Sequence, residues 1–484
     1  MNHPGSPLAL LDALRAVVGE AHLLTSDPDV APYAEDWRRR YRGEPLCVAL
    51  PGSTEEVAQI VRHCAAAGVP VLPQGGNTGL VGAATPIGGR RADGTAPVIV
   101  AMRRMHRIRE IDTVGNTIVA EAGCVLQTLQ EAADARGRLY AVTLGAEGSC
   151  QIGGNLSTNA GGTGVVKYGA TRDQVLGLEM VLPDGRVWDG LRTLRKDNTG
   201  YALRHLVCGA EGTLGIVTAV SLRLHPKPAV WASAWLTMDT VDAALKCLSA
   251  LQSIAGERIC AWELLNRRQM QTVIEQMPEI RLPTDPEAPY AVLLELSDTY
   301  PKADLGALMQ DALGELFEAG WLRDAAVAAS EAQRASFWKI RHSVTESNRK
   351  SGMGLSTDVA VPVRALPEFI DRASQAVQRR YPQAEILLVS HMGDGNVHFI
   401  PRFSFDEWAK FGDRQAAVAD EVRGIVHDEA NALGGTFSAE HGVGHVLVGE
   451  LERLRPPVEL EMMRRIRSAW DPQGLFNRGK LLRG

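Results

Sequence analysis

The sequence predicts an α+β protein built from two or three domains, and three observations indicate this fold class. The chain has 484 residues, whereas a single hydrophobic core usually stops growing at about 250–300 residues. Segments with helical spacing alternate with short strand-like runs, and helical segments dominate after about residue 415. The composition, 45% hydrophobic and 22% charged, is that of a globular protein and excludes bulk disorder or a collagen-like chain.

The first part of the chain predicts a mixture of helices and strands. Residues 1–40 carry leucines and valines at helical spacing. Ser53 and Glu56 form a capping-box pair before an apolar stripe, and Gly68 ends that helix. A strand is expected to follow from Val69 and to stop at Pro73.

A second strand and helix are expected at residues 117–122 and 125–136. Residues 176–188 predict a hairpin, because Pro183-Asp184-Gly185 is a favourable turn sequence.

The run His225-Pro226-Lys227-Pro228 predicts a domain boundary. Two strand–helix–strand stretches are expected after it, then a helix over residues 328–350, further strands and a mostly helical tail. We therefore expect three parts, which comprise residues 1–226, 227–430 and 431–484.

Charge and cysteine usage exclude several functions. The net charge of −6 argues against nucleic-acid binding, which needs a concentrated basic face. No apolar stretch approaches the roughly 20 residues of a membrane helix, and no signal peptide is recognisable at the N-terminus. Seven widely spaced cysteines without a C-x-x-C pair are typical of reduced thiols, so we expect a cytoplasmic protein.

Glycine is concentrated in three segments, which lie at residues 73–82, 145–169 and 209–215. Glycine lets a backbone approach a ligand closely, and successive N–H groups can bind a pyrophosphate. Any one segment is more simply a set of tight turns. Three of them, interleaved with Asn and Thr, favour a large phosphate-bearing cofactor.

Two common nucleotide motifs do not explain these glycines. No G-x-G-x-x-G follows a predicted strand, so a Rossmann dinucleotide site is not supported. Residues 474–480 spell G-x-x-x-x-G-K, but Leu481 replaces the required Ser or Thr, so this match is fortuitous.

Long ungapped motifs carry a family resemblance over about residues 30–482. PQGGNTGLVG (73–82), the glycine-rich run 145–185 and KDNTGYALRHLVCGAEGTLGIVT (196–218) resemble the FAD-binding domain of the vanillyl-alcohol oxidase type. Within that group the chain resembles the D-2-hydroxyacid dehydrogenases, which comprise D-2-hydroxyglutarate and D-lactate dehydrogenases and the glycolate oxidase large subunit. The resemblance implies a two-subdomain FAD-binding domain, an α+β substrate (cap) domain and a helical C-terminal segment that returns to the flavin.

The resemblance implies noncovalently bound FAD, with its pyrophosphate on residues 73–80 and its ring system against residues 145–162 and 209–217. NRGK (477–480) resembles the family's N-P-G-K, with Arg478 replacing the proline, so Asn477 and Lys480 are weaker candidates than the rest. The expected cofactor-binding residues are Pro73, Gly75, Gly76, Asn77, Thr78, Gly79, Leu80, Gly145, Gly148, Ser149, Gly153, Gly154, Asn155, Thr158, Asn159, Gly161, Gly162, Tyr168, Gly209, Glu211, Gly212, Gly215, Ile216 and Asn477.

SHMGDGNVH (390–398) contains a pair of histidines around a turn. A two-residue hairpin turn at Asp394-Gly395 would place His391 directly opposite His398, with Cβ atoms about 5 Å apart. Both imidazoles could then bind one metal ion. The simpler alternative is that both histidines only cap strands.

SAEHGVGH (438–445) adds Glu440 and His441, and two imidazoles with a carboxylate are the ligands of an open zinc site. The resemblance implies that His391, His398 and Glu440 bind a divalent metal, for which we expect zinc, and that His441 is the catalytic base.

FWKIRHSVTESN (337–348) predicts a substrate-binding helix face. Arg341 and Thr345 are spaced i, i+4, and an arginine fork suits a carboxylate. The alternative is a surface helix with scattered charge. The resemblance implies that both residues bind the substrate carboxylate, but Ser356 and Ile400 stand where the 2-hydroxyglutarate type has lysine and asparagine.

Taken together, the sequence predicts a flavoprotein dehydrogenase that oxidises a D-2-hydroxyacid to a 2-oxoacid, with D-2-hydroxyglutarate favoured and D-lactate as the alternative. The expected electron acceptor is an electron-transfer flavoprotein, a quinone or a cytochrome, and a second copy of the chain is a further candidate partner. A nicotinamide-dependent flavin reductase and a non-catalytic flavin- or metal-binding protein are the rival interpretations.

Overall fold

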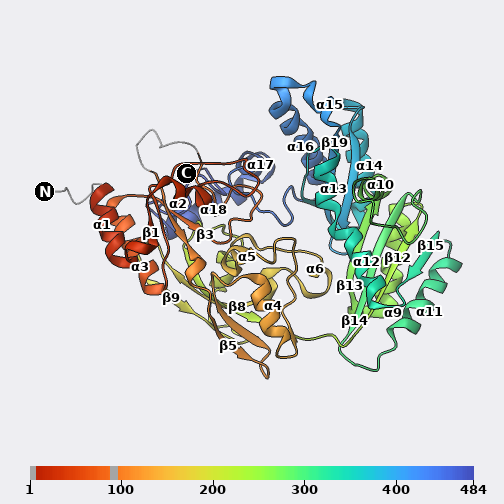
Figure 1. Ribbon diagram of the computed structural model, residues 1–484, viewed down its shortest axis with the longest axis horizontal. Helices are drawn as coiled ribbons and strands as arrows, with labels where there is room; N and C mark the ends of the chain where they lie inside the picture. Colours follow the sequence, from red (N-terminus) through yellow and green to blue (C-terminus); the bar gives the residue numbers. More distant parts are fainter. Residues whose placement is uncertain (1–6, 88–95, 484) are drawn as a thin grey trace. The chain divides into compact units, whose positions relative to one another are not determined.

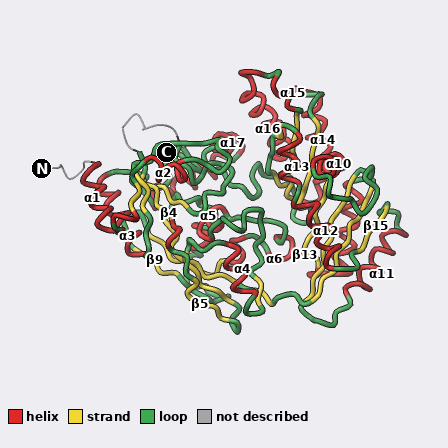
Figure 2. Tube along the Cα trace, in the orientation of Figure 1, coloured by secondary structure: helices red, strands yellow, loops and turns green. Residues whose placement is uncertain are grey.

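The computed structural model describes residues 7–87 and 96–483, and the chain forms two compact units (Figures 1 and 2). Within the described residues, unit 1 comprises the chain up to Gly161, Ala170–Lys227 and the segment from Glu440 onward. Unit 2 comprises Gly162–Gly169 and Pro228–Ala439. Each unit has its own hydrophobic core.

Unit 1 contains two main sheets. The first has the order β1-β2-β4-β3, in which β2, β4 and β3 are parallel. Its strands are β1 (Leu23–Leu24), β2 (Cys47–Ala49), β3 (Val71–Gln74) and β4 (Val98–Ala101). The strand expected to stop at Pro73 runs one residue further. Proline is tolerated there because β3 is an edge strand of this sheet.

The second sheet of unit 1 is antiparallel and has the order β5-β6-β10-β8-β9. Its strands are β5 (Ile108–Asp112), β6 (Thr117–Glu121), β8 (Val175–Val181), β9 (Val187–Gly190) and β10 (Ile216–Arg223). The predicted hairpin is confirmed as β8–β9. Leu182 N–H donates to the Arg186 carbonyl across the turn, and Gly185 has a φ of +78°. A two-stranded ribbon pairs β7 (Arg138–Leu139) with β11 (His225–Pro226).

Helices surround these sheets. They are α1 (Pro7–Val18), α2 (Asp27–Ala34), α3 (Thr54–Ala67), α4 (Leu126–Asp134), α5 (Ile152–Thr158), α7 (Thr171–Gln174), α8 (Leu203–Val207), α17 (Val448–Leu454) and α18 (Pro457–Trp470). Two of the predicted α3 caps are confirmed: Ser53 Oγ accepts the Glu56 N–H at 3.2 Å, and Gly68 closes the helix with a φ of +67°. The Glu56 carboxylate accepts the Gly52 N–H at 2.8 Å instead of the Ser53 N–H, so only half of the capping box forms.

Unit 2 is built on one antiparallel sheet of eight strands, ordered β15-β12-β14-β13-β18-β19-β16, with β17 beside β19. The strands are β12 (Val230–Met238), β13 (Ile259–Asn266), β14 (Tyr290–Asp298), β15 (Asp324–Val327), β16 (Met353–Gly354), β17 (Val359–Ala360), β18 (Glu385–His391) and β19 (Asn396–Phe403).

Helices cover both faces of this sheet, because successive strand residues are buried on opposite sides (Figure 1). Leu236 belongs to one core cluster and its neighbour Trp235 to the other. The helices are α6 (Val165–Tyr168), α9 (Val241–Ala255), α10 (Arg267–Gln276), α11 (Leu305–Glu318), α12 (Glu331–His342), α13 (Val344–Ser351), α14 (Leu366–Arg380), α15 (Phe405–Ala409) and α16 (Gln415–Ala432).

The helical segment expected around residues 328–350 is confirmed, but the chain forms it as two helices, α12 and α13, with a one-residue break at Ser343. Arg341 and Thr345 therefore lie on different helices. Ser343 keeps helical backbone angles and its side chain makes no capping hydrogen bond, so apolar spacing gives no signal of this break.

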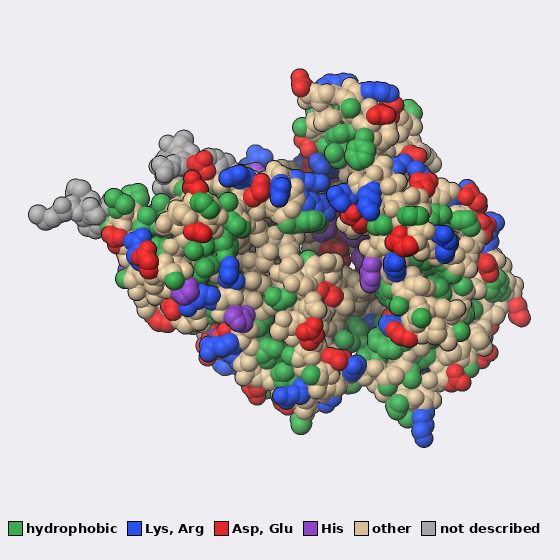
Figure 3. Space-filling model, viewed as in Figure 1, with side chains coloured by type: hydrophobic (Ala, Val, Ile, Leu, Met, Phe, Trp, Pro, Cys, Tyr) green, Lys and Arg blue, Asp and Glu red, His purple; other side chains and the backbone are tan. Residues whose placement is uncertain are grey.

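All seven cysteines are buried and none forms a disulfide. Among the described helices, none is long and apolar enough to span a bilayer. Acidic and basic side chains are interspersed over much of the face drawn in Figure 3.

Candidate active site

The first two glycine segments meet in unit 1. A Cβ added to Gly76 would lie 2.2 Å from the backbone oxygen of Ser149, so only glycine permits this approach. At Gly79, Gly145 and Gly154 an added Cβ would meet nothing within 4 Å. These positions therefore leave open space beside exposed backbone, which is what a bound phosphate or flavin requires.

The third glycine segment joins the other two. Gly209 N–H donates to the Leu156 carbonyl at 3.0 Å, and a Cβ on Gly212 would lie 3.2 Å from Pro73. The sequence predicted each segment separately, and the fold brings all three together.

Three buried side-chain oxygens in this region have no hydrogen-bond partner among the described residues: Gln151 Oε1, Asn155 Oδ1 and Asn477 Oδ1. A buried polar atom without a partner is costly, and the polar edges of FAD would satisfy these oxygens. Together with the open glycine backbone, they make unit 1 fit this cofactor.

Other predicted cofactor residues use their side chains to hold the loops. Asn77 Nδ2 donates to the Glu35 carbonyl at 2.7 Å, and Asn159 Oδ1 accepts the Arg172 N–H at 2.8 Å. Both asparagines adopt positive φ angles of 52°. Gly162 and Tyr168 lie in the short segment of unit 2 that contains α6, whereas the remaining predicted cofactor residues lie in unit 1.

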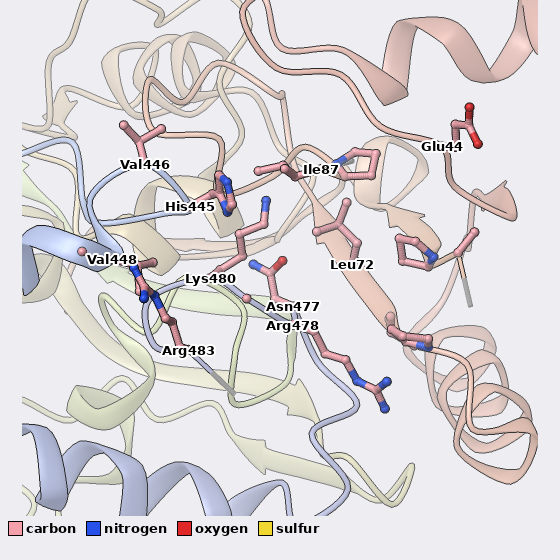
Figure 4. Close-up of a pocket in the computed structure, with 17 residues that line it drawn as sticks. Glu44, Leu72, Ile87, His445, Val446, Val448, Asn477, Arg478, Lys480 and Arg483 are labelled. Carbon is pink, nitrogen blue, oxygen red and sulfur yellow. The ribbon is translucent and has the colours of Figure 1, made fainter. Parts of the chain in front are cut away.

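A cavity of about 500 Å³ lies beside the glycine segments in unit 1 (Figure 4). Only Asn477 of the predicted cofactor residues lines it, together with Lys480, His445 and apolar residues of β3. The cavity is therefore adjacent to the expected FAD site rather than identical with it.

The histidine pair of unit 2 lies in the β18–β19 hairpin, but the predicted register is wrong. His391 pairs with Asn396, so the loop has four residues instead of two, and His398 pairs with Val389. The backbone of Gly395 packs against the Val361 carbonyl, which favours the longer loop. The imidazoles are still neighbours, because His391 and His398 are diagonal on one face with ring centroids 5.4 Å apart.

Glu263 on β13 is a site residue that the sequence reasoning missed. Its carboxylate accepts Arg341 Nε at 2.7 Å and His391 Nδ1 at 2.8 Å. Burial alone would raise the pKa of Glu263, but the neighbouring His391 and Arg341 lower it to about 2. A lone carboxylate within the apolar strand sequence ICAWELL was the available signal.

Arg341 is mostly buried and approaches the histidine pair. Its side chain is 13% exposed, and Nη2 lies 3.4 Å from His391 Nε2. Thr345, the other predicted substrate residue, is exposed on α13. Lys350, which could have replaced the missing lysine, pairs with Glu346 on the surface at 3.5 Å.

A second carboxylate, Asp358, stands beside His398, with Oδ1 3.8 Å from Nδ1. The Ala439 N–H donates to Asp358 Oδ2 at 3.2 Å. The backbones of Ser438 and Asp358 form an isolated parallel β-bridge. Glu440 and His441 follow Ala439 directly, so peptide bonds hold them next to Asp358. Asp358, His398, Glu440 and His441 form a candidate metal-binding group.

This donor set suits a divalent metal, since two imidazoles and two carboxylates are ordinary zinc ligands. Asp358 was not anticipated from the sequence, although it lies two residues after Ser356 in LSTDVAVPV. His391 does not belong to the candidate group, because its ring is turned toward Glu263 and Arg341.

Comparison with known proteins identifies the family. The model of the FAD-binding domain matches residues 45–190, and that of the FAD-linked oxidase C-terminal domain matches residues 227–481. The mitochondrial D-2-hydroxyglutarate dehydrogenase of Arabidopsis thaliana is 34% identical over 97% of this chain and 80% of its own length. The D-2-hydroxyglutarate dehydrogenase of Stutzerimonas stutzeri is 32% identical over 98% of both chains.

Solved structures confirm the fold. p-Cresol methylhydroxylase with bound substrate has a TM-score of 0.74 at 15% identity, over 98% of this chain and 96% of its own. Alkyldihydroxyacetonephosphate synthase has a TM-score of 0.72 at 17% identity, over 99% and 85%. The vanillyl-alcohol oxidase-type fold expected from the sequence is thereby confirmed. The chain belongs to the FAD-dependent oxidoreductases with FAD-linked oxidase domains, the family that includes the D-2-hydroxyglutarate dehydrogenases.

Proposed function

We propose that the protein oxidises a D-2-hydroxyacid to the corresponding 2-oxoacid, with D-2-hydroxyglutarate as the favoured substrate. The observation that carries this proposal is the cluster of His391, His398, Asp358 and Arg341 on unit 2, which combines metal ligands with a carboxylate receptor. The names of the D-2-hydroxyglutarate dehydrogenases related to the chain support the substrate class.

Each histidine of the pair has one nitrogen next to a carboxylate. Glu263, with a pKa of about 2, is ionised and only accepts, so His391 Nδ1 must carry the proton. Asp358 Oδ1 lies 3.8 Å from Nδ1 of His398, which is close enough for electrostatic attraction but longer than a hydrogen bond.

A neighbouring carboxylate commonly orients a ligating histidine, which leaves Nε2 for the metal. In His391 the Nη2 of Arg341 lies 3.4 Å from Nε2, so metal binding by His391 requires Arg341 to turn away toward the substrate. We propose His391, His398 and Glu440 as ligands of a divalent metal, with zinc the expected ion.

Two groups of the chain act on the substrate in this proposal. Arg341 binds a carboxylate through its Nη atoms, since Nε is held by Glu263. His441 removes the proton of the 2-hydroxyl as general base. A divalent metal at this site would supply Lewis-acid polarisation of the 2-hydroxyl. FAD would supply the hydride acceptor, so that loss of the hydroxyl proton to His441 and of the hydride from C2 leaves a 2-oxoacid.

The second substrate candidate is D-lactate, and one observation favours it. Ile400 is buried in β19, where an asparagine would offer a polar group, and Ser356 is exposed. The pocket thus has less polar support for a second carboxylate. The electron acceptor in our proposal is an electron-transfer flavoprotein, a quinone or a cytochrome.

An anaerobic screen of D- and L-2-hydroxyacids, followed by the loss of flavin absorbance, tests the proposal. We expect D-2-hydroxyglutarate to reduce the flavin fastest and the L-isomers not to reduce it. Faster reduction by D-lactate would select the alternative substrate. Bleaching by NADPH, and by no hydroxyacid, would favour a nicotinamide-dependent reductase.

His441→Ala tests the base. Loss of a general base typically costs about 10²–10⁴-fold in rate, while flavin binding should persist. Full activity of this variant would remove His441 from the mechanism. His205→Ala, on the short helix α8, is the control and should leave the rate unchanged.

A further inference from the structure

One buried carboxylate of unit 1 holds the turn that follows Glu440 and His441. Glu211 is 4% exposed. Its Oε1 accepts the Val443 N–H at 2.7 Å, and its Oε2 accepts the Gly444 N–H at 2.6 Å. Both donors lie within three residues of His441. Burial raises the pKa of Glu211, whereas the two N–H donors and Lys480 oppose that shift, and both carboxyl oxygens act as acceptors.

The turn is shaped around this carboxylate. A Cβ added to Gly442 would lie 2.8 Å from Glu211 Oε1, and Gly442 has a φ of +82°. Gly444 has a φ of +53°, and its added Cβ would lie 2.1 Å from the Val81 carbonyl. Gly442 and Gly444 are therefore needed for the turn to fit between Glu211 and Val81. A substitution at Glu211 would disturb Gly442, which directly follows His441.

Glu211 is itself held rigidly. It is one of the few non-glycine residues with a positive φ, 51°, and its N–H donates to the Ser157 carbonyl at 2.8 Å. Asn477 Nδ2 donates to the Glu211 carbonyl at 2.6 Å. Lys480, which lines the cavity in Figure 4, is buried nearby and donates to the carbonyls of Gly82 and Thr85. The carboxylate thus ties the turn to the loops that carry the cofactor glycines.

We propose that Glu211 is a positioning residue for His441. Its two hydrogen bonds hold the turn 442–444, and this fixes the imidazole relative to the glycine segments that bind FAD. The sequence motif GAEGTLG suggested a cofactor contact for Glu211, whereas its carboxylate faces the turn. The inference rests on the proposed function, in which His441 is the base.

A double-mutant cycle tests the inference in the flavin-loaded protein. Glu211→Gln keeps the size and shape of the side chain, but its amide NH2 then faces one of the two backbone N–H donors, and that hydrogen bond is lost. We expect anaerobic flavin reduction by the hydroxyacid to slow by about 10–100-fold, with substrate affinity and flavin content unchanged. In the His441→Ala background the same substitution should change the rate less than twofold, because groups that act as one unit are non-additive.

Hydrogen exchange gives a readout that does not depend on activity. Peptides that cover residues 440–446 should exchange faster in Glu211→Gln than in the parent protein. Glu121→Gln is the matched control, because Glu121 is equally buried and accepts the Arg107 N–H at 3.0 Å. This control should change neither the exchange at 440–446 nor the reduction rate.

Should Glu211→Gln fail to yield folded flavoprotein, Gly442→Ala tests the contact between Glu211 and the turn from the other side. This substitution should slow flavin reduction when made in the parent protein, but not when made in His441→Ala. Equal fold-changes in both backgrounds would overturn the inference and indicate a general effect on packing. If Glu211→Gln reduces the flavin at the parental rate while His441→Ala is slow, the role of Glu211 is refuted and the proposed base is retained. A fully active His441→Ala would instead refute His441 as the base.

Discussion

Glu263 and His391 are direct partners in the sheet of unit 2 and are joined by a 2.8 Å hydrogen bond. β13 and β18 place the two residues opposite each other, and the carboxylate also accepts Arg341 Nε. The buried carboxylate thus orients both a proposed metal ligand and the proposed substrate arginine.

Glu263→Gln should destabilise unit 2 by about 3 kcal/mol, because removing one partner leaves Arg341 as a buried charge without compensation. Urea denaturation measures this effect, and the KM for substrate should rise as Arg341 loses its anchor. Glu346→Gln removes an exposed ion pair with Arg349 and should cost no more than about 0.5 kcal/mol. Equal stability of both variants would contradict the role of Glu263.

Metal content distinguishes a ligand from an orienting carboxylate. After chelation and reloading with zinc, the parent should bind one equivalent and His398→Asn almost none. Asp358→Asn should still bind one equivalent with about 10–100-fold weaker affinity, if Asp358 orients His398. His342→Asn, on the exposed end of α12, is the control. Complete loss of zinc from Asp358→Asn would make Asp358 a ligand instead.

Gly154→Ala tests where FAD lies. An added Cβ at Gly154 meets no protein atom within 4 Å, so the substitution can clash only with a bound group. We expect FAD affinity to fall by at least about tenfold, while the apoprotein gains about 0.5–1 kcal/mol from the helical alanine. Gly314→Ala is matched, since this helical glycine of α11 also has open space. Unchanged FAD affinity in Gly154→Ala would place the flavin elsewhere.

Lys480 predicts a pH dependence of stability. Burial lowers the pKa of Lys480 to about 7, with Glu211 opposing the shift and His445 nearby. The folded pKa is below the unfolded value of about 10.4, so the unfolded state binds more protons between these values. Stability therefore rises with pH through this range and is lost as the pH falls toward 7.

We expect the parent protein to gain about 2 kcal/mol relative to Lys480→Met between pH 7 and pH 9. Urea denaturation at the two pH values measures this difference. A constant difference between the two proteins would mean that Lys480 titrates normally.

Local features of the fold could be predicted from the sequence. The Ser53 cap, the turn at Gly185 and the three glycine segments depend on residues close in sequence, and the structure has all of them. The register of β18–β19 could not be predicted, because Asp394-Gly395 suits a two-residue turn. The strand pairing gives a loop of four residues, which the contact between Gly395 and Val361 favours.

Composition, motifs and short-range spacing were enough to predict the fold class, the family and the residue types suited to a flavin and a metal. Which side chains meet depends on the folded chain. Glu263 reaches His391 across 128 residues, and Glu211 reaches Gly444 across 233. Such contacts depend on strand order and loop closure, and no local pattern in the chain records them.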